Sequence, residues 1–159
     1  MAGKKRLSGL GEGARQTAEP PGEPAAKLNT LGERRRELAP GRPGDGARLL
    51  CASRDLLDGG DGIRFELERA GETVPAFAIR HRGRVHAFLN RCAHISMELD
   101  WNPGKFFDAE GEYLICSTHG ALYAPESGAC HGGPCRGAKL VALEVFEEGG
   151  AVYLNLNEG

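Results

Sequence analysis

Residues 92–97 read Cys-Ala-His-Ile-Ser-Met, and residues 116–121 read Cys-Ser-Thr-His-Gly-Ala. Each of these segments, called box one and box two below, places one thiol and one imidazole on a single tight turn. The chain between the boxes is long enough to run out along one loop and return along the next. All four side chains can therefore converge on one centre. They are Cys92 and His94 from box one, and Cys116 and His119 from box two.

Two thiolates and two imidazoles suit an iron–sulfur cluster in which one iron has only sulfur ligands and the other carries both histidines. Three other readings use the same residue types. A zinc site of this composition usually pairs Cys with Cys and His with His, and a helix follows. A thiol nucleophile with a histidine base leaves the second pair unexplained. A purely structural role for all four side chains requires the double pattern to arise by chance.

The first 46 residues differ in composition from the rest of the chain. They contain nine Gly and five Pro, and nine Lys or Arg against six Asp or Glu, which gives a charge of +3. Residues 47–159 contain eleven basic and sixteen acidic residues, which gives −5. The N-terminal segment lacks the apolar residues that a packed core needs. We therefore expect a disordered, Gly/Pro-rich basic arm over 1–46 and one folded domain over 47–159.

The folded part has the pattern of antiparallel β-structure. Ile63, Phe65 and Leu67 alternate with charged residues, as in a half-buried strand. Further strands are predicted over 74–80 and 85–90, and a hairpin is predicted from 140–147 and 151–156. The intervening stretch, about 91–139, is loop-rich and contains both boxes. Loops on a rigid sheet are where functional residues usually lie.

At this point the chain resembles the Rieske ferredoxins and Rieske domains, over roughly residues 49–156. Box one, box two and the later Gly132-Gly133-Pro134 segment carry the resemblance. It implies an all-β Rieske iron–sulfur domain: a small antiparallel β-sandwich or barrel with a cluster-binding loop subdomain. It also implies one [2Fe–2S] cluster per chain. Cys92 and Cys116 would bind one iron, and His94 and His119 the other. Gly120, Ala121, Tyr123 and Pro134 would surround these ligands.

Two departures from the family pattern bear on the kind of centre. The spacing between the boxes is several residues longer than usual, and the excess falls in 102–112. High-potential members carry an extra cysteine in each box, joined as a disulfide, where this chain has Met97 and Thr118. They also have a serine where this chain has Ala121, and the hydroxyl of that serine donates a hydrogen bond to the cluster. In this chain Tyr123 is the donor that remains. Fewer donors favour a low potential, near the bottom of the range of about −150 to +300 mV.

The other cysteines and histidines receive plainer predictions. Cys130 and Cys135 can pair, but in a reducing compartment we expect free thiols. Cys51 is expected in the core of the first strand, and His81 and His86 are expected to be ordinary strand residues. His131 adjoins the Gly-Pro turn, so a position near the centre stays open.

The resemblance implies a one-electron carrier, without a catalytic site of its own, that passes electrons from a reductase to a terminal enzyme such as an oxygenase. The reductase is expected to be a flavoprotein. The alternative is a fixed small subunit of a larger reductase, or a redox-sensing adaptor. No apolar run approaches the length of a membrane span. We expect a cytoplasmic protein that binds neither nucleic acid nor membranes.

Overall fold

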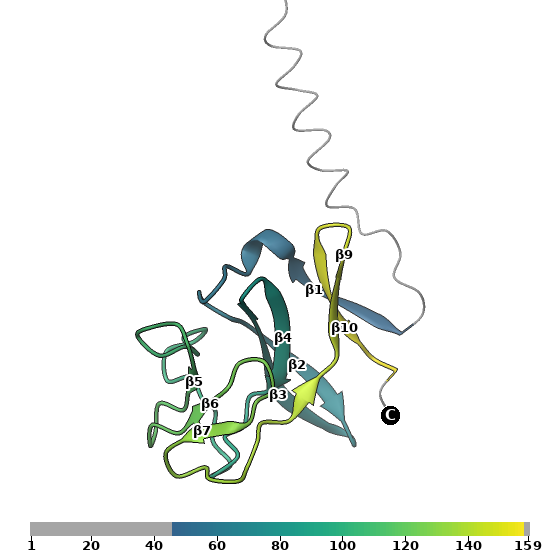
Figure 1. Ribbon diagram of the computed structural model, residues 1–159. Helices are drawn as coiled ribbons and strands as arrows, with labels where there is room; N and C mark the ends of the chain where they lie inside the picture. The colour runs from purple at the N-terminus through teal and green to yellow at the C-terminus, as the bar shows by residue number, and fades with distance from the viewer. Residues whose placement is uncertain (1–45, 158–159) are drawn as a thin grey trace, which may run out of the picture. The chain divides into compact units, whose positions relative to one another are not determined.

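The computed structural model describes residues 46–157, so the prediction for the N-terminal arm lies outside the described residues. Antiparallel strands dominate this part of the chain, as predicted, and its one helix is a short 3-10 turn, η1 (Ser53–Asp55). The strands form three sheets (Figure 1). The first contains β1 (Ala47–Ala52), β10 (Ala151–Asn155) and β9 (Val145–Glu148), and the second contains β2 (Ile63–Arg69), β3 (Glu72–His81), β4 (Arg84–Leu89) and β8 (Ala142–Leu143). The third contains β5 (Leu114–Ile115), β6 (Leu122–Tyr123) and β7 (Cys130–Gly132).

Strand β3 separates two cores, because successive side chains of a strand point to opposite faces. Its four central residues, 76–79, are fully buried. Ala78 faces a small core between the first and second sheets, together with Leu56 and Val152. Phe77 and Ile79 face a larger core that holds the loop-rich segment against the second sheet. The alternation of small and large side chains on β3 therefore places the loop-rich segment on one face of the central sheet.

The hairpin predicted from 140–147 and 151–156 is only partly correct. The first of these segments breaks at Glu144 into β8 and β9, which belong to different sheets. β8 pairs with β4, whereas β9 forms the expected hairpin with β10 around Gly149 and Gly150. A strand that changes sheets at a bend closes the corner of a sandwich.

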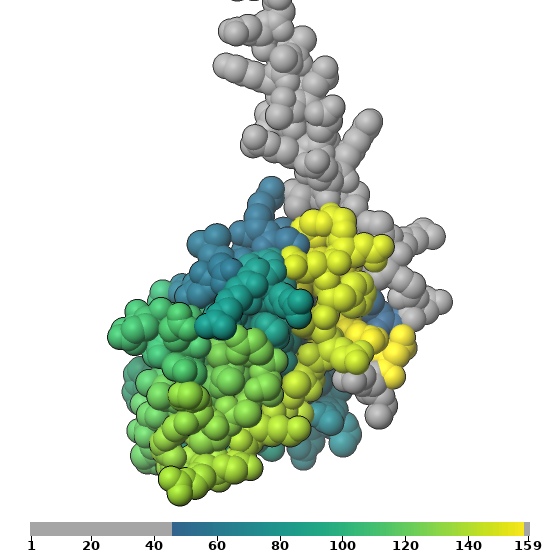
Figure 2. All heavy atoms as spheres, in the orientation of Figure 1, coloured from purple at the N-terminus to yellow at the C-terminus, as the bar shows by residue number. Residues whose placement is uncertain are grey.

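The loop-rich segment is ordered by an aromatic anchor that its polar sequence does not suggest. Phe106 is fully buried, and its ring stacks on Phe77 with a centroid distance of 3.9 Å. After Phe106, the extra residues between the two boxes form a compact turn. In this turn the Asp108 carboxylate accepts hydrogen bonds from the backbone N–H groups of Glu112 and Tyr113. Figure 2 shows this segment, in green, as one continuous region beside the C-terminal hairpin, in yellow. No helix within residues 46–157 is long and apolar enough to cross a membrane.

Candidate metal centre

Box one begins where β4 ends, and a buried amide–carboxylate pair fixes its course. Asn90 donates from Nδ2 to the carboxylate of Asp100 (2.8 Å), and its Oδ1 accepts from the backbone N–H of Leu99 (2.9 Å). The other Asp100 oxygen accepts from the N–H of Gly104 (2.9 Å). Both side chains are almost completely buried. Residues 91–98 are therefore held at both ends by the same polar network.

Box two is a tight loop between β5 and β6. The N–H of Cys116 donates to the carbonyl of Ala121 (2.8 Å), and the N–H of Gly120 donates to the carbonyl of Cys116 (2.9 Å). Gly120 has a φ of +70°, a conformation that glycine adopts without strain. The backbone thus turns sharply directly after His119. The N–H of Ser117 donates to Leu99 O (2.9 Å), which ties box two to the end of box one.

The two boxes bring their thiols inward and their imidazoles toward the surface. Cys92 and Cys116 are buried within the larger core. His119 is exposed and His94 is partly exposed. Their rings meet edge to face, with centroids 4.9 Å apart. The structure thus brings together the four side chains that the sequence pattern selects, with sulfur inside and nitrogen at the surface.

Hydrogen-bond donors converge on both sulfur atoms. Burial by itself would raise the pKa of Cys92, but donation from the Tyr123 hydroxyl (3.1 Å from Sγ), from His94 and from the backbone N–H of Ile95 lowers it to about 6. Burial and the neighbouring Cys92 raise the pKa of Cys116, against donation from backbone N–H groups of the box-two turn. Donors of this kind stabilise an anionic sulfur ligand.

The ligand types and their placement fit a two-iron cluster. No group of three or more His, Cys, Asp or Glu side chains within residues 46–157 is arranged to hold one ion. A structural zinc site needs four ligands around one ion. A two-iron cluster needs only two protein ligands for each iron, because sulfide completes the coordination. One buried pair of thiols and one surface pair of imidazoles meet that requirement.

Of the residues expected around the ligands, Tyr123 contacts one of them directly. The Tyr123 hydroxyl contacts Cys92 Sγ and accepts a bond from the N–H of Ala93 (3.1 Å). Burial and the nearby Cys92 raise the pKa of Tyr123, so the hydroxyl keeps its proton and remains a donor. Ala121 is buried and has no side-chain donor, and Pro134 is exposed.

The expectation of free thiols at 130 and 135 is wrong, because Cys130 and Cys135 form a disulfide. The intervening Gly132-Gly133 turn brings their Cα atoms to 5.6 Å, which is within the range that a disulfide spans. Cys51 is free and only half-buried, at the edge of the smaller core. Burial and the carboxylate of Asp55 raise its pKa to about 11, as in an unreactive thiol.

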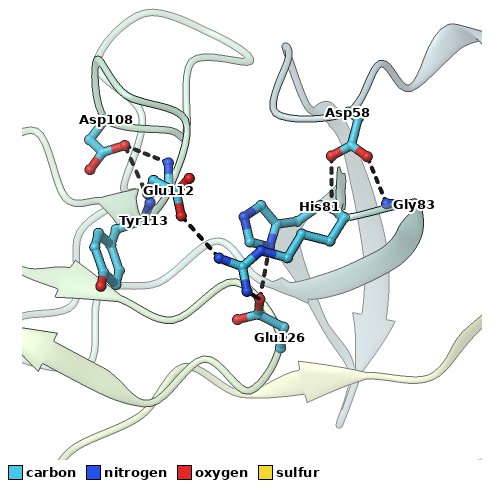
Figure 3. A network of polar contacts seen from close by, with 8 residues as sticks. Asp58, His81, Gly83, Asp108, Glu112, Tyr113 and Glu126 are labelled. Carbon is cyan, nitrogen blue, oxygen red and sulfur yellow. Dashed lines mark hydrogen bonds and ion pairs between the residues drawn. The ribbon is translucent and has the colours of Figure 1, made fainter.

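A polar network links the central sheet to the loop-rich segment (Figure 3). His81 is buried, and its Nδ1 lies 2.9 Å from a carboxylate oxygen of Glu126, in the loop after β6. Arg82 extends from the next position to Glu112 (3.1 Å) and Glu126 (3.9 Å). His81 is the last residue of β3, as expected, and its side chain lies against the loop after β6. His86 lies on β4 as expected, and His131 stacks on Tyr113, with centroids 4.1 Å apart.

An exposed tryptophan beside the boxes is not among the residues that the sequence pattern selects. The side chain of Trp101 is 82% exposed, and its backbone N–H donates to Ser117 Oγ (3.4 Å). It lines a shallow groove of about 390 Å³ with Met97 and Thr118, one from each box. The alternation of apolar and polar residues does not identify such a residue, because an exposed side chain contributes nothing to the core.

Comparisons with known proteins agree with this geometry. The family model of the Rieske [2Fe–2S] domain matches residues 47–147. The ferredoxin of carbazole 1,9a-dioxygenase from Nocardioides aromaticivorans IC177 superposes with a TM-score of 0.54 at 21% identity, covering 70% of this chain and 98% of that chain. A complex of reduced oxygenase and oxidized ferredoxin in carbazole 1,9a-dioxygenase superposes with a TM-score of 0.53 at 23% identity. The match covers 69% of this chain and 92% of that chain.

A further solved structure, the reduced complex between oxygenase and ferredoxin of the same dioxygenase, matches with a TM-score of 0.55 at 20% identity. The match covers 72% of this chain but only 29% of the other, so this chain spans less than a third of that protein. No curated protein matches by sequence. At these identities, the structural likeness shows a shared fold.

Proposed function

Because the chain belongs to the Rieske [2Fe–2S] domain family and its domain binds one such cluster, we propose that it is a one-electron carrier. A cluster of this type takes up and releases a single electron. The proposed ligands are Cys92 and Cys116 on one iron, and His94 and His119 on the other. Convergence of these four side chains supports that assignment, and Tyr123 would donate to the sulfur of Cys92.

The exposure of the histidine pair is the observation that carries the proposed role. His119 lies at the surface and contacts His94, so the histidine side of the centre is accessible to a protein that docks there. The buried thiols lie behind them, among apolar side chains that exclude water. This arrangement gives a partner protein a short path to the centre. The ferredoxins that share the fold belong to a carbazole 1,9a-dioxygenase, one of them in complex with its oxygenase, which favours an oxygenase as the terminal acceptor.

The carrier role is tested by exchange with separate proteins. The full chain, purified without oxygen, should be reduced by catalytic amounts of an NADH-dependent flavoprotein reductase from a ring-hydroxylating dioxygenase system, as followed by bleaching of visible absorbance. It should remain monomeric during turnover. Co-purification with a larger enzyme and negligible reduction of the separate chain would instead support the alternative, a fixed small subunit. We propose the cytoplasm as its location.

We also propose a potential in the lower part of the family range. Tyr123 is the side-chain hydroxyl that contacts a ligand sulfur, and Ala121 cannot donate. Each donor stabilises the reduced state, because reduction adds negative charge to the sulfur atoms. The expected midpoint is near −150 mV, and a measured value above about +100 mV would contradict the proposal.

Tyr123→Phe and Ala121→Ser should shift this midpoint in opposite directions. Removal of the Tyr123 hydroxyl is expected to lower it by about 40 mV, which corresponds to one hydrogen bond of about 1 kcal/mol. Ala121→Ser should raise it by a similar amount (about 40 mV) if the new hydroxyl reaches the cluster. Redox titration followed by visible circular dichroism measures both changes. A Tyr153→Phe control, on β10 in the first sheet, should leave the midpoint unchanged.

The groove beside Trp101 is the proposed contact for a partner protein. Both boxes contribute to its walls, so an occupant lies next to the centre. The groove's two carboxylates, Glu98 and Asp100, both lie near the guanidinium of Arg64 (2.6 and 3.6 Å), which balances part of their charge. A large aromatic ring on a fixed backbone is the usual anchor of a protein interface. We therefore propose that an apolar patch of the reductase or the terminal acceptor covers Trp101.

Trp101→Ala should weaken docking without affecting the centre. A truncated interface anchor typically costs about 2 kcal/mol, so the second-order rate of reduction by the flavoprotein reductase should fall about thirtyfold. The matched control is Leu57→Ala, since Leu57 is 68% exposed but does not line the groove. Reduction by dithionite should be equal in all three proteins. An unchanged rate with the reductase would remove Trp101 from that interface.

A further inference from the structure

The disulfide between Cys130 and Cys135 closes a loop that lies directly on box two. Residues 131–134 form this loop, called the cover loop below. A Cβ atom added to Gly133 would lie 3.0 Å from the carbonyl oxygen of Gly120 and 3.1 Å from Cα of Ala121. Gly133 also has a φ of +84°. Backbone therefore packs against backbone, and displacement of the cover loop would remove this contact from box two.

The disulfide also belongs to the same core as the proposed ligands. Cys135 belongs to the same buried core as Cys92 and Cys116. On the other side, Cys130 is the β7 partner of Tyr123, whose hydroxyl contacts Cys92 Sγ at 3.1 Å. A change at the disulfide can therefore reach box two through the cover loop and box one through Tyr123.

The two sulfur atoms are not equivalent. Cys135 is only 2% exposed, whereas Cys130 is partly exposed and accessible to an attacking thiolate. Carbonyl oxygens already surround Cys135 Sγ, at 3.2 Å for Gly132 and 3.5 Å for Leu122. A reduced Cys135 thiol would therefore find acceptors in place. The fold can hold both the disulfide and the dithiol without leaving a buried donor unpaired.

We propose that Cys130 and Cys135 form a thiol–disulfide exchange site through which a dithiol reductant controls access to the cluster. A thiolate of the reductant attacks Cys130 Sγ, forms a mixed disulfide and releases Cys135 as a thiolate, which takes up a proton. The second thiol of the reductant then displaces Cys130. Two protein thiols result, and the reductant leaves as its own disulfide, so two electrons and two protons have passed to the protein. Opening the ring frees the cover loop and exposes box two.

The proposal rests on the ligand assignment above, and its test requires no partner protein. The holoprotein is treated with dithiothreitol without oxygen, freed of the reagent, and mixed with excess EDTA. Loss of visible absorbance should be about tenfold faster than before treatment, because the loop-closure constraint is gone. Iodoacetamide should label two more cysteines per chain by mass. Reoxidation should restore the slow rate.

Two variants make the result specific. The double variant Cys130→Ser/Cys135→Ser should lose absorbance at the fast rate without treatment, and dithiothreitol should not accelerate it further. Cys51→Ser, which removes a thiol outside the cover loop, should behave as the natural protein in both states. Equal rates before and after reduction, with both thiols labelled, would overturn the proposal, as would equal acceleration in the double variant. Absence of iron and sulfide would instead refute the ligand assignment, while the labelling would still report on the disulfide.

Discussion

Cys116→Ser should abolish cluster binding. Cys116 is fully buried, and donors from the box-two turn point at its sulfur. A serine hydroxyl is a much poorer iron ligand than a thiolate, because it stays protonated at neutral pH. The variant should contain less than about a tenth of the two irons and two sulfides expected per chain, and its visible absorbance should be lost. Iron and acid-labile sulfide analysis of protein purified without oxygen measures this directly.

Cys51→Ser is the matched control, since Cys51 is the free cysteine outside the boxes within residues 46–157. It should retain a full cluster. His119→Ala should also lose the cluster, because one iron would keep a single protein ligand. A zinc site predicts a different result, with one zinc and no sulfide in the natural protein. Retention of iron and sulfide by Cys116→Ser would show that the ligand assignment is wrong.

The fold and the proximity of the four candidate ligands could be predicted because each depends on local pattern. Alternation along Ile63, Phe65 and Leu67 reports a half-buried strand, and the burial along β2 follows it. The two boxes contain their ligands within three or four residues, so a tight turn suffices to bring each pair together. Tyr123 and Gly120 also lie close to a ligand in sequence or in the family pattern.

The features that the sequence did not predict depend on contacts between distant segments. Phe106 lies in a polar stretch, and only its stacking on Phe77 shows that it belongs to the core. At Glu144 the strand breaks, because the residues before it pair with β4 and the residues after it pair with β10. Alternation of apolar and polar residues does not specify the partner strand. The expected reducing compartment suggested free thiols at 130 and 135. The Gly132-Gly133 turn instead brings the two cysteines together as a disulfide.

Asp100 shows how such a distant contact supports the site. Its carboxylate accepts bonds from Asn90 and Gly104 and lies 3.6 Å from the guanidinium of Arg64. Asn90 in turn accepts from the N–H of Leu99, whose carbonyl binds box two. Removal of this one carboxylate leaves buried donors without partners and releases both boxes. The unpaired groups should be costly, because water cannot easily reach them.

Asp100→Ala should therefore lower the free energy of unfolding by about 3 kcal/mol, from two buried donors at roughly 1–3 kcal/mol each. Asp100→Asn, which keeps one acceptor oxygen, should lose less. The control is Asp61→Ala, because Asp61 forms an exposed ion pair with Lys105 that contributes less than about 1 kcal/mol. Urea unfolding of the holoproteins, followed by far-ultraviolet circular dichroism, gives the three values. If Asp100→Ala unfolds at the same urea concentration as Asp61→Ala, the buried network does not hold the boxes, and their position must come from apolar packing around Leu99 and Phe106 alone.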